Sequence, residues 1–544
     1  MIKQMTTITN QNIIKSSEIK FHNGCDLPFP IFEGNCEEFG TLNIKMRDDI
    51  EIIDTTCTRI YFNIDCSGSM SDVCSDNRTK MSHILHTLEN MLRVLHSKKE
   101  ANISVHIQAF DCGIYEYVTD EKMIKDNNIE EIIQKIKGIY PRASTNIENA
   151  LKIINKRIST YVLDNPTHNI VHIFLTDGQI TEGSYDKDII KSLVNDNYAN
   201  IFVCYGIEHD SSLLSYISNN KKGEYRFIDA LEKAGFVYGE ILNDILFKAL
   251  EDVEILVKNG EIYDYEKNTW SDTLYVGNLV NEQNKTYHLR SSNSIDVNAI
   301  IYGKSIISSD KIVDKQMEIG VVYNNNLEDL TKYIFRQKTQ ELLYEVRHVS
   351  DNDNDNDNDN DNDNDNDIGN IFRNHKTNAN KKYSNSIKNK LKIYLKHITE
   401  YMTVNNLNND EFLKTLCDDI YIVFRTIDTH VGQMYACARQ ISQGRQHTYV
   451  ISELNDNIFS PSNMQRSNHF NMQRSNQYIG DGFMQILKLT KHKKILYTEE
   501  DSDDEINDYV VSDVMSPYRT NSAIKMMRSV SGNNSIGRDL NEDI

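Results

Sequence analysis

Near its beginning the chain reads Ile60-Tyr61-Phe62-Asn63-Ile64-Asp65-Cys66-Ser67-Gly68-Ser69-Met70, and the predicted fold follows from these residues. An apolar run is followed at once by one carboxylate and two hydroxyls, two residues apart, on a turn that contains glycine. Apolar residues then recur at helical spacing between Met81 and Leu95. A strand, a polar turn and a helix in this order are typical of an α/β domain, in which ligands collect beyond the carboxyl ends of the strands. Aspartate and serine oxygens are hard donors that suit magnesium better than zinc or copper.

The pattern continues on both sides of this turn. Between residues 57 and 257, apolar strand patterns alternate with helical patterns, which predicts a doubly wound, mostly parallel sheet. The segment 170–175 is nearly continuous in apolar residues, as a strand covered on both faces requires. The expected strands are 59–64, 103–110, 114–118, 170–175 and 201–205, and the expected helices are 81–95, 129–136, 147–158, 187–194 and 239–250.

The flanking segments indicate other kinds of structure. Alternating polar and apolar residues predict half-exposed antiparallel strands at 41–46, 254–257, 274–276, 286–289 and 297–302. We therefore expect a small antiparallel β unit into which the α/β domain is inserted. Helical periodicity follows at 327–346, 387–402 and 412–441. The expected organisation is an N-terminal segment with strands (1–56), the α/β domain (57–250), a β unit pairing with the N-terminal strands (251–325), a helical region (326–450) and a mostly disordered tail (451–544).

One low-complexity segment interrupts the helical region. Residues 351–367 alternate strictly between Asp and Asn and contain no apolar side chain, so we expect a disordered insert over about 350–380. An EF-hand is not expected here, because Ile368 stands where that loop needs glycine.

Composition excludes several classes of protein. The formal net charge of -21 argues against nucleic-acid binding, which needs a basic footprint. The nine cysteines contain no Cys-x-x-Cys pair, which favours reduced thiols over disulfides or a zinc site. No apolar run reaches signal-peptide or membrane-spanning length. We expect an intracellular, cytoplasmic protein without membrane insertion.

Two further segments carry oxygen side chains at predicted strand and helix ends. Thr145 precedes a helix, and Asp177 with Gly178 ends a buried strand. If these loops meet the first turn, then five oxygen side chains surround one point: Asp65, Ser67, Ser69, Thr145 and Asp177. Each also has an ordinary alternative: the serines as turn caps, Thr145 with Glu148 as a capping box, and Asp177-Gly178 as turn chemistry.

The set Asp65-x-Ser67-x-Ser69, Thr145 and Asp177-Gly178 resembles the metal-ion-dependent adhesion site of von Willebrand factor type A (vWA) domains. The resemblance covers about residues 57–250. It implies a six-stranded, mostly parallel sheet wrapped by helices, and Mg²⁺ or Mn²⁺ held directly or through water by those five residues. It also implies a protein partner whose Asp or Glu completes the coordination, and a domain that is not catalytic.

The flanks resemble intracellular vWA proteins and the heavy chains of inter-alpha-trypsin inhibitor. Some intracellular relatives carry a RING finger, but this chain lacks the paired cysteines and histidines that such a finger needs. The Asn-, Ile-, Lys- and Asp-rich composition resembles proteins of AT-rich genomes such as those of giant DNA viruses or social amoebae, in which case a virion location is an alternative.

The leading hypothesis is a non-enzymatic interaction scaffold that binds an acidic partner residue through Mg²⁺. One alternative is a structural or virion-assembly protein in which the metal only stabilises the fold. Another is a metal-dependent hydrolase, which is disfavoured because phosphatases with an aspartate after the first strand need a second acid where this chain has Ser67. The small basic segment 443–447 is expected to be a solvated helix end.

Overall fold

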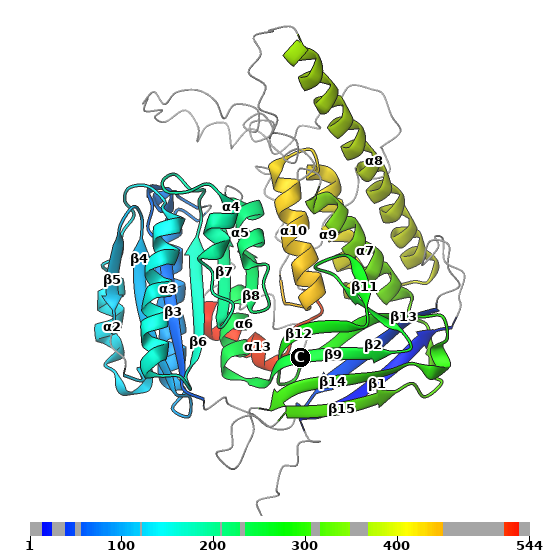
Figure 1. The fold of residues 1–544 in the computed structure, drawn as a ribbon, viewed down its shortest axis with the longest axis horizontal. Helices are drawn as coiled ribbons and strands as arrows, with labels where there is room; N and C mark the ends of the chain where they lie inside the picture. Colours follow the sequence, from blue (N-terminus) through cyan, green and yellow to red (C-terminus); the bar gives the residue numbers. More distant parts are fainter. Residues whose placement is uncertain are drawn as a thin grey trace, which may run out of the picture.

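The computed structural model describes residues 13–23, 38–48, 56–74, 76–119, 122–206, 209–228, 234–305, 316–348, 368–449 and 516–531. They form an α/β domain, a β unit built from two sheets, and a helical region above the β unit (Figure 1). The predicted fold class is confirmed: a mostly parallel six-stranded sheet is accompanied by antiparallel sheets and C-terminal helices. No helix within the described ranges is both long enough and apolar enough to cross a membrane.

The sheet of the α/β domain has the strand order β5-β4-β3-β6-β7-β8. Only β5 runs antiparallel to its neighbour. Every residue of β3 and β4 is buried, because helices cover both faces of the sheet. The strands are β3 (Thr58–Asp65), β4 (Ile103–Phe110), β5 (Ile114–Val118), β6 (Asn169–Thr176), β7 (Ala199–Tyr205) and β8 (Gly223–Ile228), of which β8 was not among the expected strands.

Helices on the two faces of this sheet belong to different apolar cores. One face carries α1 (Lys80–Ser97), α2 (Ile129–Ile136) and α6 (Ala234–Leu246), and the other carries α3 (Ile147–Asp164), α4 (Lys187–Ser192) and α5 (Ser211–Ser218). The expected helix 239–250 is wrong at its end, because β9 begins at Lys248. Apolar residues around Phe247 fit a buried helix or a buried strand equally well, so periodicity does not place this boundary.

A short helix from the far end of the chain packs on the first face. Helix α13 (Asn521–Ser531) places Met526 and Val530 in the same apolar core as α1 and α6. The contact is close, since a Cβ built on Gly239 of α6 would lie 2.4 Å from Cα of Met527. The tail therefore contains an ordered helix, although we expected 451–544 to be mostly disordered. Residues 451–515 and 532–544 lie outside the described residues.

The β unit combines strands from before and after the α/β domain. Strand β2 pairs antiparallel with β13, from Glu38 opposite Ser291 to Lys45 opposite Asn284. Its two sheets have the orders β11-β10-β13-β2-β1-β16 and β12-β9-β14-β15, and they enclose one apolar core. The strands are β1 (Ile14–His22), β2 (Glu38–Met46), β9 (Lys248–Lys258), β10 (Glu261–Asp264), β11 (Thr269–Ser271), β12 (Thr273–Val280), β13 (Asn284–Ser291), β14 (Asn298–Ser305), β15 (Gln316–Val322) and β16 (Leu327–Glu328).

The helical region consists of α7 (Thr331–Arg347), α8 (Ile368–Val404), α9 (Glu411–Thr426) and α10 (His430–Arg445). Residues of all four contribute to one apolar core. Cys437, Ala438 and Ile441 of α10 also pack against the core of the α/β domain, so the two parts are in direct contact. Helix α8 begins at Ile368, inside the segment 350–380 that we expected to be disordered, while the Asp-Asn repeat itself lies outside the described residues.

Candidate functional site

The five predicted site residues all lie at the carboxyl edge of the parallel sheet. Asp65 is the last residue of β3, and Asp177 follows the last residue of β6. Because β3 and β6 are parallel neighbours, both aspartates emerge at the same edge. Ser69 lies on the 3-10 turn Gly68–Ser71 after β3, Ser67 comes directly before that turn, and Thr145 lies just before α3.

Short contacts join the three loops. Ser69 Oγ donates a hydrogen bond of 2.8 Å to Asp177 Oδ1, and Ser67 Oγ lies 3.1 Å from Ser69 Oγ. A Cβ built on Gly178 would lie 3.6 Å from both Ser69 Oγ and Thr145 Oγ1, so these hydroxyls flank the same glycine. The structure thus brings the first turn, the loop before α3 and the loop after β6 together, which was the condition stated for the five side chains to surround one point.

The ordinary alternatives for these side chains do not describe what they contact. Ser67 precedes the 3-10 turn but makes no capping hydrogen bond with its side chain. The cap of α3 is Asn146, whose side chain accepts a hydrogen bond from Asn149 N, so Thr145 is not the capping residue. Asp177 uses its carboxylate across loops rather than within its own turn. The oxygens of Ser67, Ser69 and Asp177 therefore face one another, while Asp65 also accepts a local hydrogen bond from Ser67 N.

The two carboxylates of this cluster are buried, which makes their negative charges costly in free energy. Asp65 has no exposed surface, and Asp177 is 1% exposed. Burial raises the pKa of Asp65 to about 6, and the negative charge of Asp177 adds to the effect. Asp65 is held by two hydrogen bonds, one of 2.8 Å from Ser67 N to Oδ1 and one of 2.6 Å from Thr176 Oγ1 to Oδ2. Two carboxylates buried near each other favour a cation between them.

The side chain of Lys80, at the start of α1, was not predicted to belong to the site. Its Nζ lies 2.6 Å from Asp177 Oδ2 and 3.1 Å from Asp72 Oδ2. The lysine side chain is 16% exposed, whereas that of Asp72 is 55% exposed. Lys80 therefore contacts the carboxylate oxygen of Asp177 that Ser69 does not use.

The donor set fits a small hard cation. Two carboxylates and three hydroxyls supply only oxygen, which is the ligand type that Mg²⁺ and Mn²⁺ prefer. In the part of the chain that the structure describes, no three His, Cys, Asp or Glu side chains are grouped as a metal site. If a cation binds here, Asp65 and Asp177 would supply negative charge, and Ser67, Ser69 and Thr145 would supply neutral oxygens.

Neighbouring polar residues have structural roles. Asp111 Oδ1 accepts a hydrogen bond of 2.6 Å from Gly113 N, its Oδ2 lies 3.3 Å from Arg142 Nε, and its carbonyl accepts from Asn146 N. It thereby orders the loop that carries Thr145. His83, which is buried, has its Nε2 2.9 Å from Asp76 Oδ1 and makes a local ion pair or hydrogen bond.

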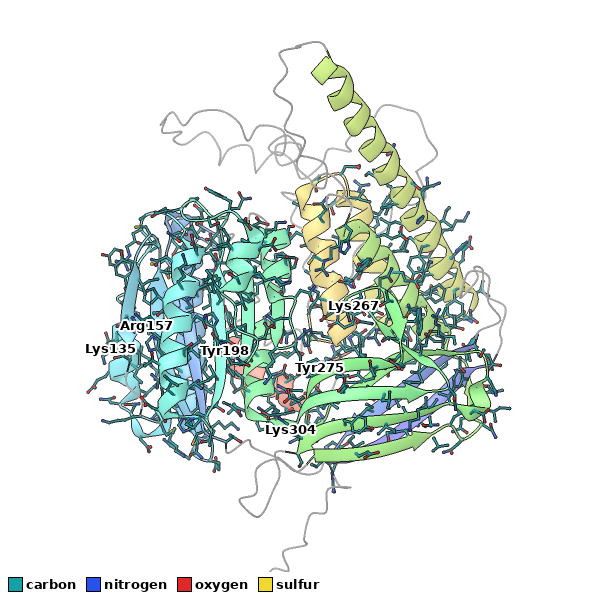
Figure 2. The ribbon with its side chains drawn as sticks, in the orientation of Figure 1. Lys135, Arg157, Tyr198, Lys267, Tyr275 and Lys304 are labelled. Carbon is teal, nitrogen blue, oxygen red and sulfur yellow. The ribbon has the colours of Figure 1, made fainter. Side chains whose placement is uncertain are left out.

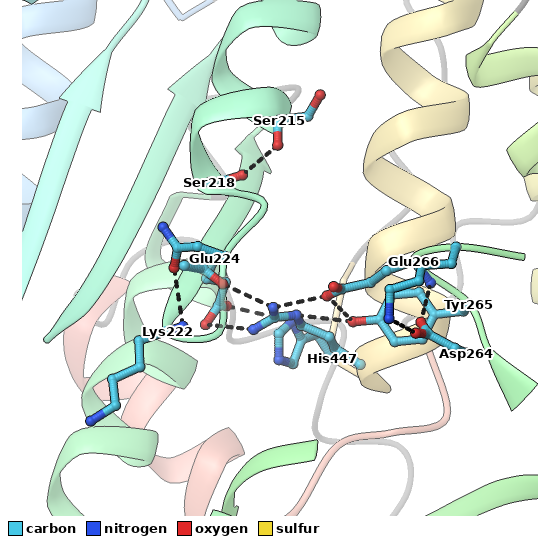
Figure 3. Close-up of polar contacts among 12 residues, drawn as sticks. Ser215, Ser218, Lys222, Glu224, Asp264, Tyr265, Glu266 and His447 are labelled. Carbon is cyan, nitrogen blue, oxygen red and sulfur yellow. Dashed lines mark hydrogen bonds and ion pairs between the residues drawn. The ribbon is translucent and has the colours of Figure 1, made fainter. Parts of the chain in front are cut away.

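A second polar cluster lies at the opposite end of the sheet, where the three parts of the protein meet. Arg445, at the end of α10, donates to the carbonyl of Gly223 at 2.8 Å, to Tyr265 Oη at 3.1 Å and to Glu266 Oε1 at 3.1 Å. Figure 3 shows Tyr265 and Glu266 facing Glu224 and His447 across this junction. The prediction of a solvated helix end at 443–447 is wrong, because these partners come from distant segments of the sequence.

A cavity of about 730 Å³ adjoins this junction. Tyr198 of the α/β domain and Tyr275 of the β unit lie on its two sides (Figure 2). The charged side chains of its wall pair mainly with one another; for example, Arg226 lies 3.6 Å from Asp244 and Lys267 lies 2.7 Å from Asp264. Positive and negative groups are mixed along the wall, so no one class of ligand is favoured by charge.

The α/β domain is similar to a domain of known proteins. Residues 60–237 match the family model described as the von Willebrand factor type A domain. Among solved structures, the chain is similar to the von Willebrand factor type A protein from Catenulispora acidiphila, with 12% identity, a TM-score of 0.40 and coverage of 63% of this chain and 82% of that chain. It is also similar to VWA2, the ArnB paralog from Sulfolobus acidocaldarius, with 13% identity, a TM-score of 0.43 and coverage of 78% and 97%.

A third similar structure is proximal thread matrix protein 1 from the mussel byssus, described with a zinc-occupied MIDAS motif. It has 15% identity and a TM-score of 0.30, and the match covers 38% of this chain and 50% of that chain. No curated protein matches the chain.

Proposed function

Residues 60–237 of this chain form a vWA domain, and on that premise we propose that the protein is a non-enzymatic interaction module that binds an acidic partner side chain through Mg²⁺ or Mn²⁺. Domains of this family are typically protein-interaction modules. The observation that carries the proposal is the meeting of Asp65, Ser67, Ser69, Thr145 and Asp177 at one edge of the sheet. A cation held by two carboxylates and three hydroxyls keeps a need for one more anionic ligand, which a partner's Asp or Glu would supply.

Exposed side chains on the three loops that carry the site residues favour a protein as the partner. Each of the three loops carries a large apolar or aromatic side chain that faces solvent: Val73 is 63% exposed, Tyr140 is 59% exposed and Tyr185 is 68% exposed. Aromatic residues of this kind provide much of the binding energy at protein interfaces. We therefore place the partner contact on Val73, Tyr140 and Tyr185 around a central metal–carboxylate bond.

The first experiment measures metal binding by the full chain. Isothermal titration with Mg²⁺ and with Mn²⁺ is compared for the wild type, Asp65→Asn, Asp177→Asn and the control Asp164→Asn. Asp164 is an exposed aspartate at the far end of α3 from Thr145. We expect binding by the wild type and the control and loss of binding in the two site variants. Equal binding by all four proteins would reject the site.

The second experiment separates metal binding from partner binding. Partners captured by the wild type in Mg²⁺ should be released by a chelator. Tyr140→Ala and Tyr185→Ala should reduce capture at least fivefold while leaving the metal affinity unchanged. The matched control is Leu163→Ala, since Leu163 is 82% exposed but lies at the opposite end of α3. Capture that survives both the chelator and Asp65→Asn would favour the structural alternative, in which the metal has no part in binding.

A further inference from the structure

The position of Lys80 adds a positively charged side chain to the site, from the start of α1. This residue is the first of α1, and its side chain reaches from the helix start to Asp177, which lies 97 residues further along the chain. The ammonium group contacts Asp177 Oδ2 at 2.6 Å while Ser69 contacts Oδ1 at 2.8 Å, so both oxygens of this carboxylate are used.

Burial makes this contact more than a surface ion pair. The side chain of Asp177 has no exposed surface and that of Lys80 is 16% exposed, so solvent screens their attraction only weakly. Asp72, the other acid that Lys80 contacts, is 55% exposed and contributes less because water surrounds it. The main electrostatic partner of Lys80 is therefore one of the two acids that would hold a cation.

We propose that Lys80 is a built-in cation of the adhesion site, which neutralises Asp177 and thereby weakens metal binding while leaving a bound metal with more net positive charge for an acidic partner. This inference rests on the proposed function. Formally, Asp65 and Asp177 together cancel the charge of a divalent ion, and Lys80 restores one positive charge within the same buried cluster. The ammonium group of Lys80 and a cation held by Asp65 and Asp177 would repel each other strongly, because little water screens charges in a buried cluster.

The same contact predicts how the protein behaves in a chelator. Without Lys80, the carboxylates of Asp65 and Asp177 would face each other with no positive group on Asp177 Oδ2. The metal-free fold should then lose stability, and added metal should restore it. With Lys80 in place, the occupancy of the site would depend on the metal concentration, but the protein would stay folded without metal.

The test compares the full-length wild type with Lys80→Met, which keeps the aliphatic length, and with Lys80→Arg, which keeps the charge. Titration calorimetry gives the Mn²⁺ and Mg²⁺ affinities, and thermal melts with a chelator and with Mn²⁺ give a readout independent of any partner. We expect Lys80→Met to bind metal at least tenfold more tightly, to melt at a lower temperature in chelator, and to gain more than the wild type from Mn²⁺. Lys80→Arg should remain within about threefold of the wild-type affinity.

The outcomes separate this inference from the proposed function. If wild type and Lys80→Met bind metal with equal affinity, or the variant binds more weakly, the role of Lys80 is overturned and the metal site stands. If neither protein binds metal, both the metal site and the role of Lys80 are overturned. If Lys80→Met melts too low to titrate, Lys80→Gln is measured under the same conditions, and equal or weaker binding by that variant again overturns the role of Lys80.

Discussion

Ser69 and Asp177 are joined by a hydrogen bond of 2.8 Å although 108 residues separate them in the sequence. The bond fixes a hydroxyl from the first turn against the carboxylate that follows β6. A second hydrogen bond, of 2.6 Å from Thr176 Oγ1 to Asp65 Oδ2, connects the ends of the same two strands, so the first turn and the loop after β6 are held together at two points.

Ser69→Ala should therefore weaken metal binding by about 10- to 100-fold, because it removes one oxygen ligand and the group that orients another. Titration calorimetry with Mn²⁺ checks this value. The control is Ser71→Ala, two residues along the same turn, whose hydroxyl is exposed and bonds only to the carbonyl of Gly68 at 2.7 Å. A similar loss in both variants would indicate that the turn, rather than the Ser69 hydroxyl, controls the affinity.

The pKa of Asp65 makes the site sensitive to mild acid. Burial, reinforced by Asp177, raises this pKa to about 6 from the ordinary value of 3.8. The folded protein thus retains a proton that the unfolded chain releases, so the metal-free protein should lose stability as the pH rises through this window. A metal needs the ionised carboxylate, so its affinity should rise over the same window and level off above about pH 7.

Metal titrations and chelator melts between pH 4.5 and about 7.5 measure both trends. In Asp65→Asn the stability change should flatten, because the titrating group is gone. Parallel pH profiles for this variant and the wild type would assign the titration to another residue.

The junction at Arg445 should contribute strongly to stability. Arg445→Met would leave the carbonyl of Gly223 and the side chain of Glu266 without this donor, at a cost of about 3 kcal/mol. Gly444→Ala should be at least as disruptive, since a Cβ there would lie 2.1 Å from the ring of Tyr265.

Chemical unfolding followed by tryptophan fluorescence is a suitable measurement, because the only tryptophan of the sequence, Trp270, lies on β11, directly after the turn that carries Tyr265 and Glu266. Lys267→Met is the control, since its side chain is 75% exposed and pairs only with Asp264. An unfolding midpoint for Arg445→Met equal to that of the control would show that the junction is not stabilised through this guanidinium.

Docking of α13 depends on buried apolar side chains. Met527 has no exposed surface, and Met527→Ala should cost about 2–5 kcal/mol. Limited proteolysis should then cleave the C-terminal segment faster, while Lys525→Ala, an exposed position on the same helix, should digest like the wild type. Equal digestion of both variants and the wild type would argue that α13 is held by other contacts, such as the hydrogen bond of 2.7 Å from Asn90 Nδ2 to the Val530 carbonyl.

The α/β core could be predicted from the sequence, because apolar runs at strand and helix spacing are local signals. The meeting of the three loops was a condition of the predicted site, which the strand-end carboxylates and the resemblance to vWA domains only suggested. Lys80 and Arg445 were missed for the opposite reason. The partner of Lys80 is 97 residues away in the sequence, and one partner of Arg445 is 222 residues away. Contacts over such separations produce no local sequence pattern from which they could be predicted. Helix α13 is too short to be stable alone, and its apolar face gains stability only against α6.

The packing of α13 has a consequence for how the chain holds together. The segment 450–515 runs between Tyr449, in the core of the helical region, and Ser516, whose amide donates to the Tyr449 carbonyl at 2.9 Å. The residues that flank this segment, Tyr449 and Ser516, are thus held side by side, and α13 beyond it is buried in the apolar core that contains α1 and α6. If the backbone were cut once within 450–515, these contacts would hold the two fragments together. The elution volume on a size-exclusion column would therefore not reveal the cut.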